Sequence, residues 1–159
     1  MIDRRKLAGL ACASAFAFAF LPKSADAAGY EVTHTEQEWR KLLTPNQFAV
    51  LREAGTERPF TSPLLEEHRK GVFACVGCGK DLFASETKFD SGTGWPSFWK
   101  PLDGAVVEEN DRSYGMDRTA VSCGRCGGHL GHVFNDGPKP TGLRYCMNGL
   151  ALTFRPAAA

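Results

Sequence analysis

The pattern of hydrophobic and polar positions changes its period once along the chain. Residues 35–54 show helical spacing, and the capping-box pattern Thr35-x-x-Glu38 starts the first helix. Pro45 ends this helix or opens a second one, which Gly55 stops. Two short helices are therefore predicted. Their apolar positions are Trp39, Leu42, Leu43, Phe48, Val50 and Leu51.

From Gly71 onward the pattern is one of short β-type runs separated by Gly, Asp, Asn or Pro. Leu150, Leu152 and Phe154 alternate with Ala151 and Thr153, as in a half-buried strand. The pattern predicts a mainly β fold, α+β if the small helices are counted. We expect a small antiparallel β domain with the N-terminal helices packed on it. The other predicted runs are 72–74, 82–83, 105–107, 119–121 and 132–134.

The first 27 residues are typical of an export signal. A basic start, Arg4-Arg5-Lys6, precedes an apolar run of 15 residues over 7–21, and Ala25-Asp26-Ala27 fits a cleavage site. The run is shorter than the roughly 20 residues that span a bilayer, which disfavours a membrane anchor. The arginine pair favours twin-arginine export over general secretion. We expect a bacterial periplasmic protein with one domain over residues 28–159 and no membrane contact after cleavage.

The charge of this predicted domain is close to neutral. Removing residues 1–27 leaves 15 of the 19 basic and 16 of the 18 acidic residues. Such a balance provides no electrostatic footprint for nucleic acid or an anionic membrane. The domain contains no internal repeat and no low-complexity linker, and we expect it to be a monomer.

Four cysteines form two Cys-x-x-Cys knuckles, each followed by glycine. They lie in Cys75–Gly79 and Cys123–Gly127, and 44 residues separate the two pairs. A tetrahedral Zn²⁺ takes four thiolates, so the pattern predicts one closed structural zinc site that staples two distant hairpins. Disulfides or a redox pair are the competing interpretations for an exported chain. The predicted ligands are Cys75, Cys78, Cys123 and Cys126.

Cys146 has no such structural task. It lies in Arg144-Tyr145-Cys146-Met147-Asn148, where a period of two puts Arg144, Cys146 and Asn148 on one face. A nearby cation favours thiolate, and an unpaired thiol with histidines elsewhere in the chain is a candidate nucleophile. The alternative interpretation is a buried free cysteine flanked by ordinary surface groups.

Two histidines and two aromatic residues are further candidates. His129 and His132 would face opposite ways in a regular strand, so both reach one site only if Gly131 marks a bulge or bend. Otherwise they are structural or exposed histidines. Trp95 and Phe98 are either core aromatics or the wall of an apolar pocket.

Taken together, four motifs resemble the B-type methionine-R-sulfoxide reductases. The likeness runs from about Trp39 to Phe154. It implies a β-rich, zinc-stapled fold and the reduction of methionine-R-sulfoxide in oxidised proteins to methionine. In chain order, the motifs are Cys75-x-x-Cys78, Gly92-x-Gly-Trp-Pro-Ser-Phe98, Cys123-x-x-Cys-x-x-His-Leu-Gly-His-Val-Phe134 and Arg144-Tyr-Cys-x-Asn148.

The resemblance also implies roles for matching positions. Cys146 would attack the sulfoxide sulfur and become a sulfenic acid, and Arg144 would tune the thiol. Trp95 would hold the substrate methyl group, with Phe134 in the same pocket. The sulfoxide oxygen would be oriented or protonated by His129, His132 and Asn148.

One position departs from the pattern of the family. Many relatives carry a resolving cysteine where this chain has Thr93. The departure implies a one-cysteine enzyme that a thioredoxin-like or other external thiol regenerates.

Two other function classes compete with a reductase. A non-catalytic zinc module that binds protein or nucleic acid explains the knuckles, yet it gives Cys146, Asn148 and Trp95 no task. A thiol peroxidase also cycles through sulfenic acid. It needs no aromatic wall for a thioether methyl group.

Overall fold

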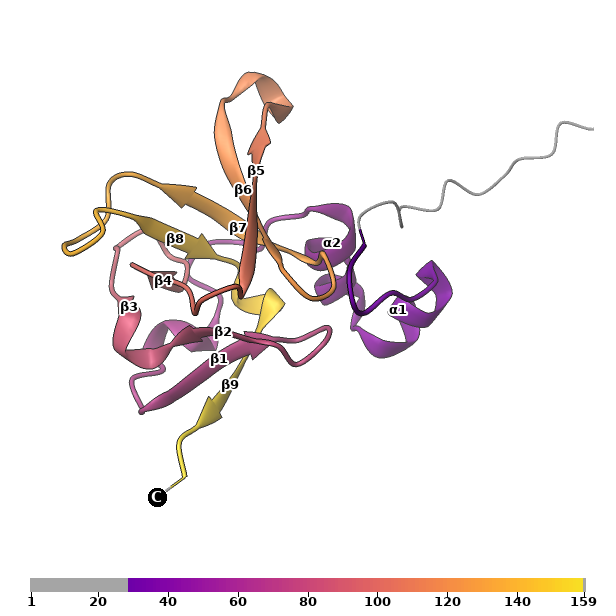
Figure 1. Cartoon of the computed structure of the whole chain (residues 1–159), viewed down its shortest axis with the longest axis horizontal. Coiled ribbons are helices and arrows are strands. Elements are labelled where there is room, and N and C mark those ends of the chain that lie inside the picture. Colours follow the sequence, from indigo (N-terminus) through magenta and orange to yellow (C-terminus); the bar gives the residue numbers. More distant parts are fainter. Residues whose placement is uncertain (1–28, 159) are drawn as a thin grey trace, which may run out of the picture.

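The computed structural model describes residues 29–158 (Figure 1). The predicted export signal over residues 1–27 lies outside the described residues. Within 29–158, no helix has both the length and the apolar character to cross a membrane. The helices and strands are α1 (Glu36–Leu42), α2 (Pro45–Glu53), β1 (Gly71–Cys75), β2 (Asp81–Ala84), β3 (Lys88–Phe89), β4 (Ser97–Phe98), β5 (Val106–Asp111), β6 (Arg118–Cys123), β7 (His129–Phe134), β8 (Arg144–Met147) and β9 (Leu152–Pro156).

Both predicted helices are present. The Thr35 hydroxyl accepts from the Glu38 backbone N–H, and the Glu38 carboxylate accepts from the Thr35 N–H, which confirms the capping box. Pro45 is the first residue of α2, and Thr44 forms a second capping box with Gln47. Trp39 and Leu43 are buried, whereas Leu42 is 59% exposed, so the apolar stripe of α1 is narrow.

The strands form two antiparallel sheets, which confirms the predicted mainly antiparallel β fold with two short helices. One sheet has the order β2-β1-β9, and the other has the order β3-β4-β8-β7-β6-β5. The β5–β6 hairpin projects away from the body at the top of Figure 1. The three-stranded sheet lies at the bottom, and α1 and α2 lie to one side.

Sequence patterns missed two strands, β3 and β4. Each has two residues, too few for any alternation to be visible. They matter because β4 pairs with β8 and so lies beside Cys146. The strand predicted to begin at Leu150 begins two residues later, since residues 149–151 form a 3₁₀ turn and β9 runs from Leu152 to Pro156.

Aromatic side chains fill the core between the two sheets. Phe98 is fully buried and stacks on Phe83 with ring centroids 4.3 Å apart, which places Phe98 in the core. Phe73 contacts the same Phe98 ring edge-on at 5.0 Å. Tyr145 and Met147 enter this core from β8. The opposite face of β8 is thereby left for Arg144 and Cys146.

Candidate active site and metal centre

Cys146 lies in a row of residues that crosses the large sheet. Its Cα pairs with Ser97 on β4 and with His132 on β7. The row continues from His132 to Ala120 on β6 and from Ala120 to Glu109 on β5. Directly opposite residues of antiparallel strands point to the same face, so the thiol and the imidazole of His132 are neighbours.

A β-bulge brings the second histidine to this face. The β6–β7 register shifts between Val121 and Ser122, so that Ser122 pairs with His129 while Ala120 pairs with His132. The ring centroids of His129 and His132 are 5.4 Å apart. The bend predicted near Gly131 is therefore present. A Cβ at Gly131 would lie 2.1 Å from the Cys146 carbonyl oxygen, so this close strand approach requires glycine.

The Cys146 thiol is half-buried, with polar groups around it. Burial raises the pKa of the thiol above its usual value, while the Thr93 hydroxyl, Arg144 and Ser97 lower it. The Thr93 Oγ1 atom lies 3.8 Å from Cys146 Sγ. At neutral pH the thiol is therefore mostly protonated in the absence of a ligand, with groups at hand that favour thiolate.

His129 is a neutral, buried imidazole. It is 8% exposed, and burial together with the nearby His132 lowers its pKa to about 4. Within residues 29–158, its Nε2 atom is buried and has no hydrogen-bond partner. Both histidines line a cleft of about 820 Å³ between β5–β7 and residues 51–56. His129 thus has a buried polar atom beside the cleft whose hydrogen-bonding capacity is unused, whereas Cys146 is not among the residues that line this cleft.

His132, in contrast, already has a hydrogen-bond partner. Its Nε2 donates to Asp111 Oδ2 at 2.8 Å, because a carboxylate can only accept. Arg118 Nη2 donates to the same oxygen at 2.7 Å. Hydrogen bonds from Ser113 and His132 hold the pKa of Asp111 well below its usual range. Asp111 therefore fixes the ring orientation of His132.

Arg144 is held beside the thiol by a second carboxylate. Its Nε and Nη2 atoms donate to Asp136 at 2.8 and 2.9 Å, a two-point contact that fixes the guanidinium plane. The guanidinium also stacks on Phe134 at 4.4 Å from the ring centroid. The predicted pocket residue Phe134 thus packs against Arg144, with its ring centroid 6.5 Å from that of His132.

The buried residue Glu57 joins Trp95 to Asn148. The Trp95 indole N–H donates to the Glu57 carbonyl at 3.2 Å, and the Glu57 N–H donates to Asn148 Oδ1 at 2.9 Å. The Glu57 carboxylate accepts from the N–H groups of Gly149 and Leu150. Burial raises the pKa of this carboxyl, and those two bonds counter the shift.

Asn148 consequently lies outside the regular strand. β8 ends at Met147, and the Asn148 amide also donates from Nδ2 to the Leu130 carbonyl at 3.1 Å. Arg144 and Cys146 share a face as predicted, whereas Asn148 binds loop and strand backbone. Its predicted contact with a sulfoxide oxygen stays a prediction.

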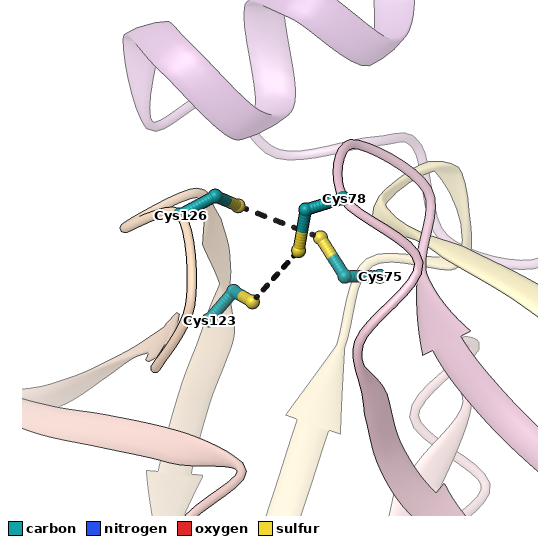
Figure 2. Close-up of side chains that lie close together, drawn as sticks. All are labelled: Cys75, Cys78, Cys123 and Cys126. Carbon is teal, nitrogen blue, oxygen red and sulfur yellow. Dashed lines mark hydrogen bonds between the residues drawn. The ribbon is translucent and has the colours of Figure 1, made fainter. Parts of the chain in front are cut away.

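The four knuckle cysteines converge on one point (Figure 2). Their sulfur atoms all lie within 4.8 Å of one another. The Cys75–Cys126 and Cys78–Cys123 sulfurs are 3.8 and 3.6 Å apart, far beyond a disulfide bond, and all five cysteines of the described part are free. Tetrahedral Zn–S bonds of about 2.3 Å place sulfurs roughly 3.8 Å apart. The four thiols therefore fit one tetrahedral metal ion.

Each knuckle has the backbone turn that this geometry requires. Gly79 and Gly127, which follow the second cysteine of each knuckle, have φ of 72° and 67°, values that favour glycine. Their N–H groups donate to the Cys75 and Cys123 carbonyls at 2.8 and 2.9 Å. Because Cys75 ends β1 and Cys123 ends β6, the cluster joins the small sheet to the large one.

Sequence analysis missed several residues that the site uses. Asp111 binds His132, and Asp136 binds Arg144, although the members of each pair are more than three positions apart in the sequence. Glu57 binds Asn148 from another loop. Near the thiol, the hydroxyl oxygens of Ser91 and Ser97 form a hydrogen bond and are 2.7 Å apart. No local pattern marks such partners, since each contact depends on how the strands and loops come together.

Comparison of the chain with known proteins shows the family to which it is similar. The SelR domain profile matches residues 43–156. A "Peptide methionine sulfoxide reductase MsrB" from Leptospira interrogans is 54% identical over 127 residues, 79% of this chain and 97% of the relative. The proteins of that name from Agrobacterium fabrum and Bradyrhizobium diazoefficiens are 54% and 56% identical, with 79% of this chain and 94% and 91% of each relative covered.

The SelR match extends over the knuckles, the Trp95 loop, both histidines and Cys146. The matches with the MsrB proteins cover nearly the whole length of those relatives. The chain therefore belongs to the SelR-domain family of MsrB peptide methionine sulfoxide reductases.

Proposed function

We propose that this protein reduces methionine-R-sulfoxide in oxidised proteins to methionine, with Cys146 as the nucleophile. The observation that carries the proposal is the register of β7 and β8. It places a free thiol opposite His132, on the face that also holds the unpartnered Nε2 of His129. Membership of the MsrB family supports the same reaction.

The reaction removes one oxygen atom from the sulfoxide. Cys146 Sγ attacks the sulfoxide sulfur and forms a sulfur–sulfur bond, and the protonated oxygen leaves as water. Attack of water on Sγ then breaks the sulfur–sulfur bond, so that the products are methionine and a Cys146 sulfenic acid. Two equivalents of an external thiol then release water and restore the Cys146 thiol through a mixed disulfide. The oxygen needs a hydrogen-bond donor as its bond breaks.

We assign the oxygen contact to His129. Its Nε2 has no partner in the described part of the chain, whereas Nε2 of His132 is bound to Asp111. With a pKa lowered to about 4, His129 is neutral at pH 7 and can donate one hydrogen bond. Trp95 would hold the substrate methyl group, since Glu57 fixes its indole and the ring is only half-buried. Phe134, beside Arg144, would complete the pocket.

One assay separates this function from its alternatives. The purified protein with dithiothreitol should steadily consume methionine-R-sulfoxide, whereas a non-catalytic zinc module consumes none. A thiol peroxidase would consume hydrogen peroxide faster than sulfoxide under the same conditions. Peroxide turnover that exceeds sulfoxide turnover would contradict the proposal.

We propose Zn²⁺ as the ion at the cysteine cluster. Four thiolates in tetrahedral reach suit zinc, and their protein ligands leave no open position for substrate. The ion would be structural, since it would join the two sheets. No step of the reaction is assigned to it.

We propose that the enzyme works with one redox-active cysteine. Thr93 lies at the position where many relatives carry a resolving cysteine, and its side chain, 3.8 Å from Cys146 Sγ, has a hydroxyl instead of a thiol. The other four cysteines of the described part form the metal cluster. A thioredoxin-like protein or a small thiol would therefore be the reductant.

After one turnover without reductant, Cys146 should remain a sulfenic acid. A sulfenic-acid trap followed by mass spectrometry should find one adduct, on Cys146. In a Thr93→Cys variant the same turnover should give an intramolecular disulfide to Cys146. The Thr93 Oγ1 atom is 3.8 Å from Cys146 Sγ, so a movement of about 2 Å reaches bonding distance.

A Thr93→Cys/Cys146→Ser double variant is the matched control and should form no such crosslink. A disulfide between Cys146 and a knuckle cysteine in the native protein would contradict the one-cysteine proposal. It would also contradict a purely structural metal site.

We also propose export to a bacterial periplasm in folded form, where the enzyme works as a monomer on oxidised proteins. The proposal rests on Arg4-Arg5 and the apolar run over 7–21. An Arg4→Lys/Arg5→Lys variant should lose export, because the twin-arginine route reads that pair. Fractionation of cells followed by immunoblotting measures it. Unchanged export would indicate the general secretion route instead.

A further inference from the structure

Three hydroxyl groups form a chain of hydrogen bonds that ends at the Cys146 thiol. Thr93 Oγ1 lies 3.8 Å from Cys146 Sγ, and Ser91 Oγ lies 2.8 Å from Thr93 Oγ1. Ser91 Oγ is also 2.7 Å from Ser97 Oγ, which in turn is 3.1 Å from the Trp95 carbonyl oxygen. The chain therefore links the thiol to a backbone carbonyl through four contacts in series.

Each hydroxyl has a single hydrogen, so the chain has two complete orientations. When Cys146 is a thiol, its S–H donates to Thr93, Thr93 to Ser91, Ser91 to Ser97, and Ser97 to the Trp95 carbonyl. When Cys146 is a thiolate, the order reverses. Ser97 then donates to Ser91, Ser91 to Thr93, and Thr93 to the sulfur anion. Every hydroxyl hydrogen has an acceptor in both states.

We propose that Thr93, Ser91 and Ser97 form a reversible hydrogen-bond relay that stabilises the Cys146 thiolate by turning its direction when the thiol loses its proton. Thr93 is the catalytic member, because its hydroxyl touches the reacting sulfur. Ser91 is a positioning residue that acts through it, and Ser97, which lies opposite Cys146 in the sheet, also acts on the thiol directly. The inference rests on the proposed function, which makes Cys146 the nucleophile.

Burial makes the relay effective. Ser97 is fully buried, and hydrogen bonds in series polarise one another where water is excluded. Desolvation of Cys146 favours the neutral thiol, and the hydroxyls of Thr93 and Ser97 act in the opposite direction. A charged acceptor roughly doubles the strength of a hydrogen bond, so the relay favours thiolate over thiol.

The loop that carries the relay is packed in place. Gly94 has a φ of 91°, and a Cβ there would lie 2.8 Å from atoms of Pro59 and Phe60. The Phe60 N–H donates to the Gly94 carbonyl at 2.8 Å. The Gly92 N–H donates to the Asp90 carboxylate at 2.9 Å. Thr93 is therefore held at the thiol by contacts on both sides.

The test measures the ionisation of Cys146 directly. The mature protein, residues 28–159, is alkylated with iodoacetamide over a pH series. The alkylation rate is measured by mass spectrometry, as the fraction of modified Cys146 peptide over time. In Thr93→Val, which replaces the hydroxyl by a methyl group of similar size, the pKa of Cys146 should rise by about one unit. Thr93→Ser keeps the hydroxyl and should leave the profile close to that of the wild type.

The Ser91→Ala variant distinguishes a relay from a single Thr93–Cys146 hydrogen bond. It should raise the pKa of Cys146 by less than Thr93→Val does, and it should add nothing in the Thr93→Val background. Unchanged alkylation profiles in Thr93→Val and Ser91→Ala would overturn the relay. A full additional shift from Ser91→Ala in the Thr93→Val background would overturn it as well.

The alkylation assay requires no sulfoxide, so the two proposals can fail separately. A shifted profile in a protein that reduces no sulfoxide would remove only the proposed function. Normal sulfoxide turnover together with unshifted profiles would remove only the relay.

Discussion

Replacing Cys146 by serine is expected to abolish reduction of methionine-R-sulfoxide, with a loss on the order of 10³-fold or more. A serine hydroxyl is a far weaker nucleophile toward sulfur than a thiol, and no other cysteine of the described part lies outside the metal cluster. Methionine formation with dithiothreitol as reductant measures the effect.

The wild-type enzyme should also act on one epimer only. In the proposed arrangement Trp95 would hold the methyl group, Cys146 would attack the sulfur and His129 would bind the oxygen, and three fixed points admit a single hand. The S epimer of methionine sulfoxide should therefore give essentially no product in the same assay.

The metal content and fold of the Cys146→Ser variant control for structural damage. Cys146 lies in β8, and the cluster consists of the four other cysteines, so Cys146→Ser should keep its metal and its fold. Loss of activity with unchanged metal content then reports on chemistry. An active serine variant, or equal rates on both epimers, would contradict the assignment of Cys146.

Removing one cluster ligand, as in Cys78→Ser or Cys126→Ser, is expected to unfold the domain or lower its melting temperature by at least about 10 °C. The cluster joins β1 of the small sheet to β6 of the large one. Structural zinc sites contribute about 10–16 kcal/mol of binding free energy, against roughly 5–15 kcal/mol of total stability in a typical domain.

Metal analysis and thermal unfolding measure this second effect. The native protein should hold about one Zn²⁺ per chain, and a strong chelator should reproduce the effect of the substitution. Cys146→Ser is the matched control, since it makes the same chemical change outside the cluster. A metal-free sample that is fully folded and active would rule out the structural zinc site.

Local patterns in the sequence were sufficient for the parts of the fold that are locally encoded. A capping box depends on residues three apart, and a knuckle depends on two cysteines and one glycine, so α1 and both turns follow from short stretches of chain. The alternation around Cys146 likewise placed Arg144 and Cys146 on the face opposite Tyr145 and Met147. The four motifs in order also predicted the family.

The surroundings of the thiol were decided by the tertiary structure alone. His132 meets Cys146 through strand register, and the shift at Ser122 brings His129 to the same face. The two-residue strand β4, too short for any periodicity, brings Ser97 beside the thiol.

The supporting contacts have the same origin. Asp111, Glu57 and the Ser91–Thr93 pair reach the site from other strands and loops, through hydrogen bonds between residues far apart in the chain. The sequence by itself determined which groups can carry the chemistry, because residue type and local spacing fix reactivity and turns. Which of them meet depends on strand pairing and loop packing, which are set by the burial of the whole core.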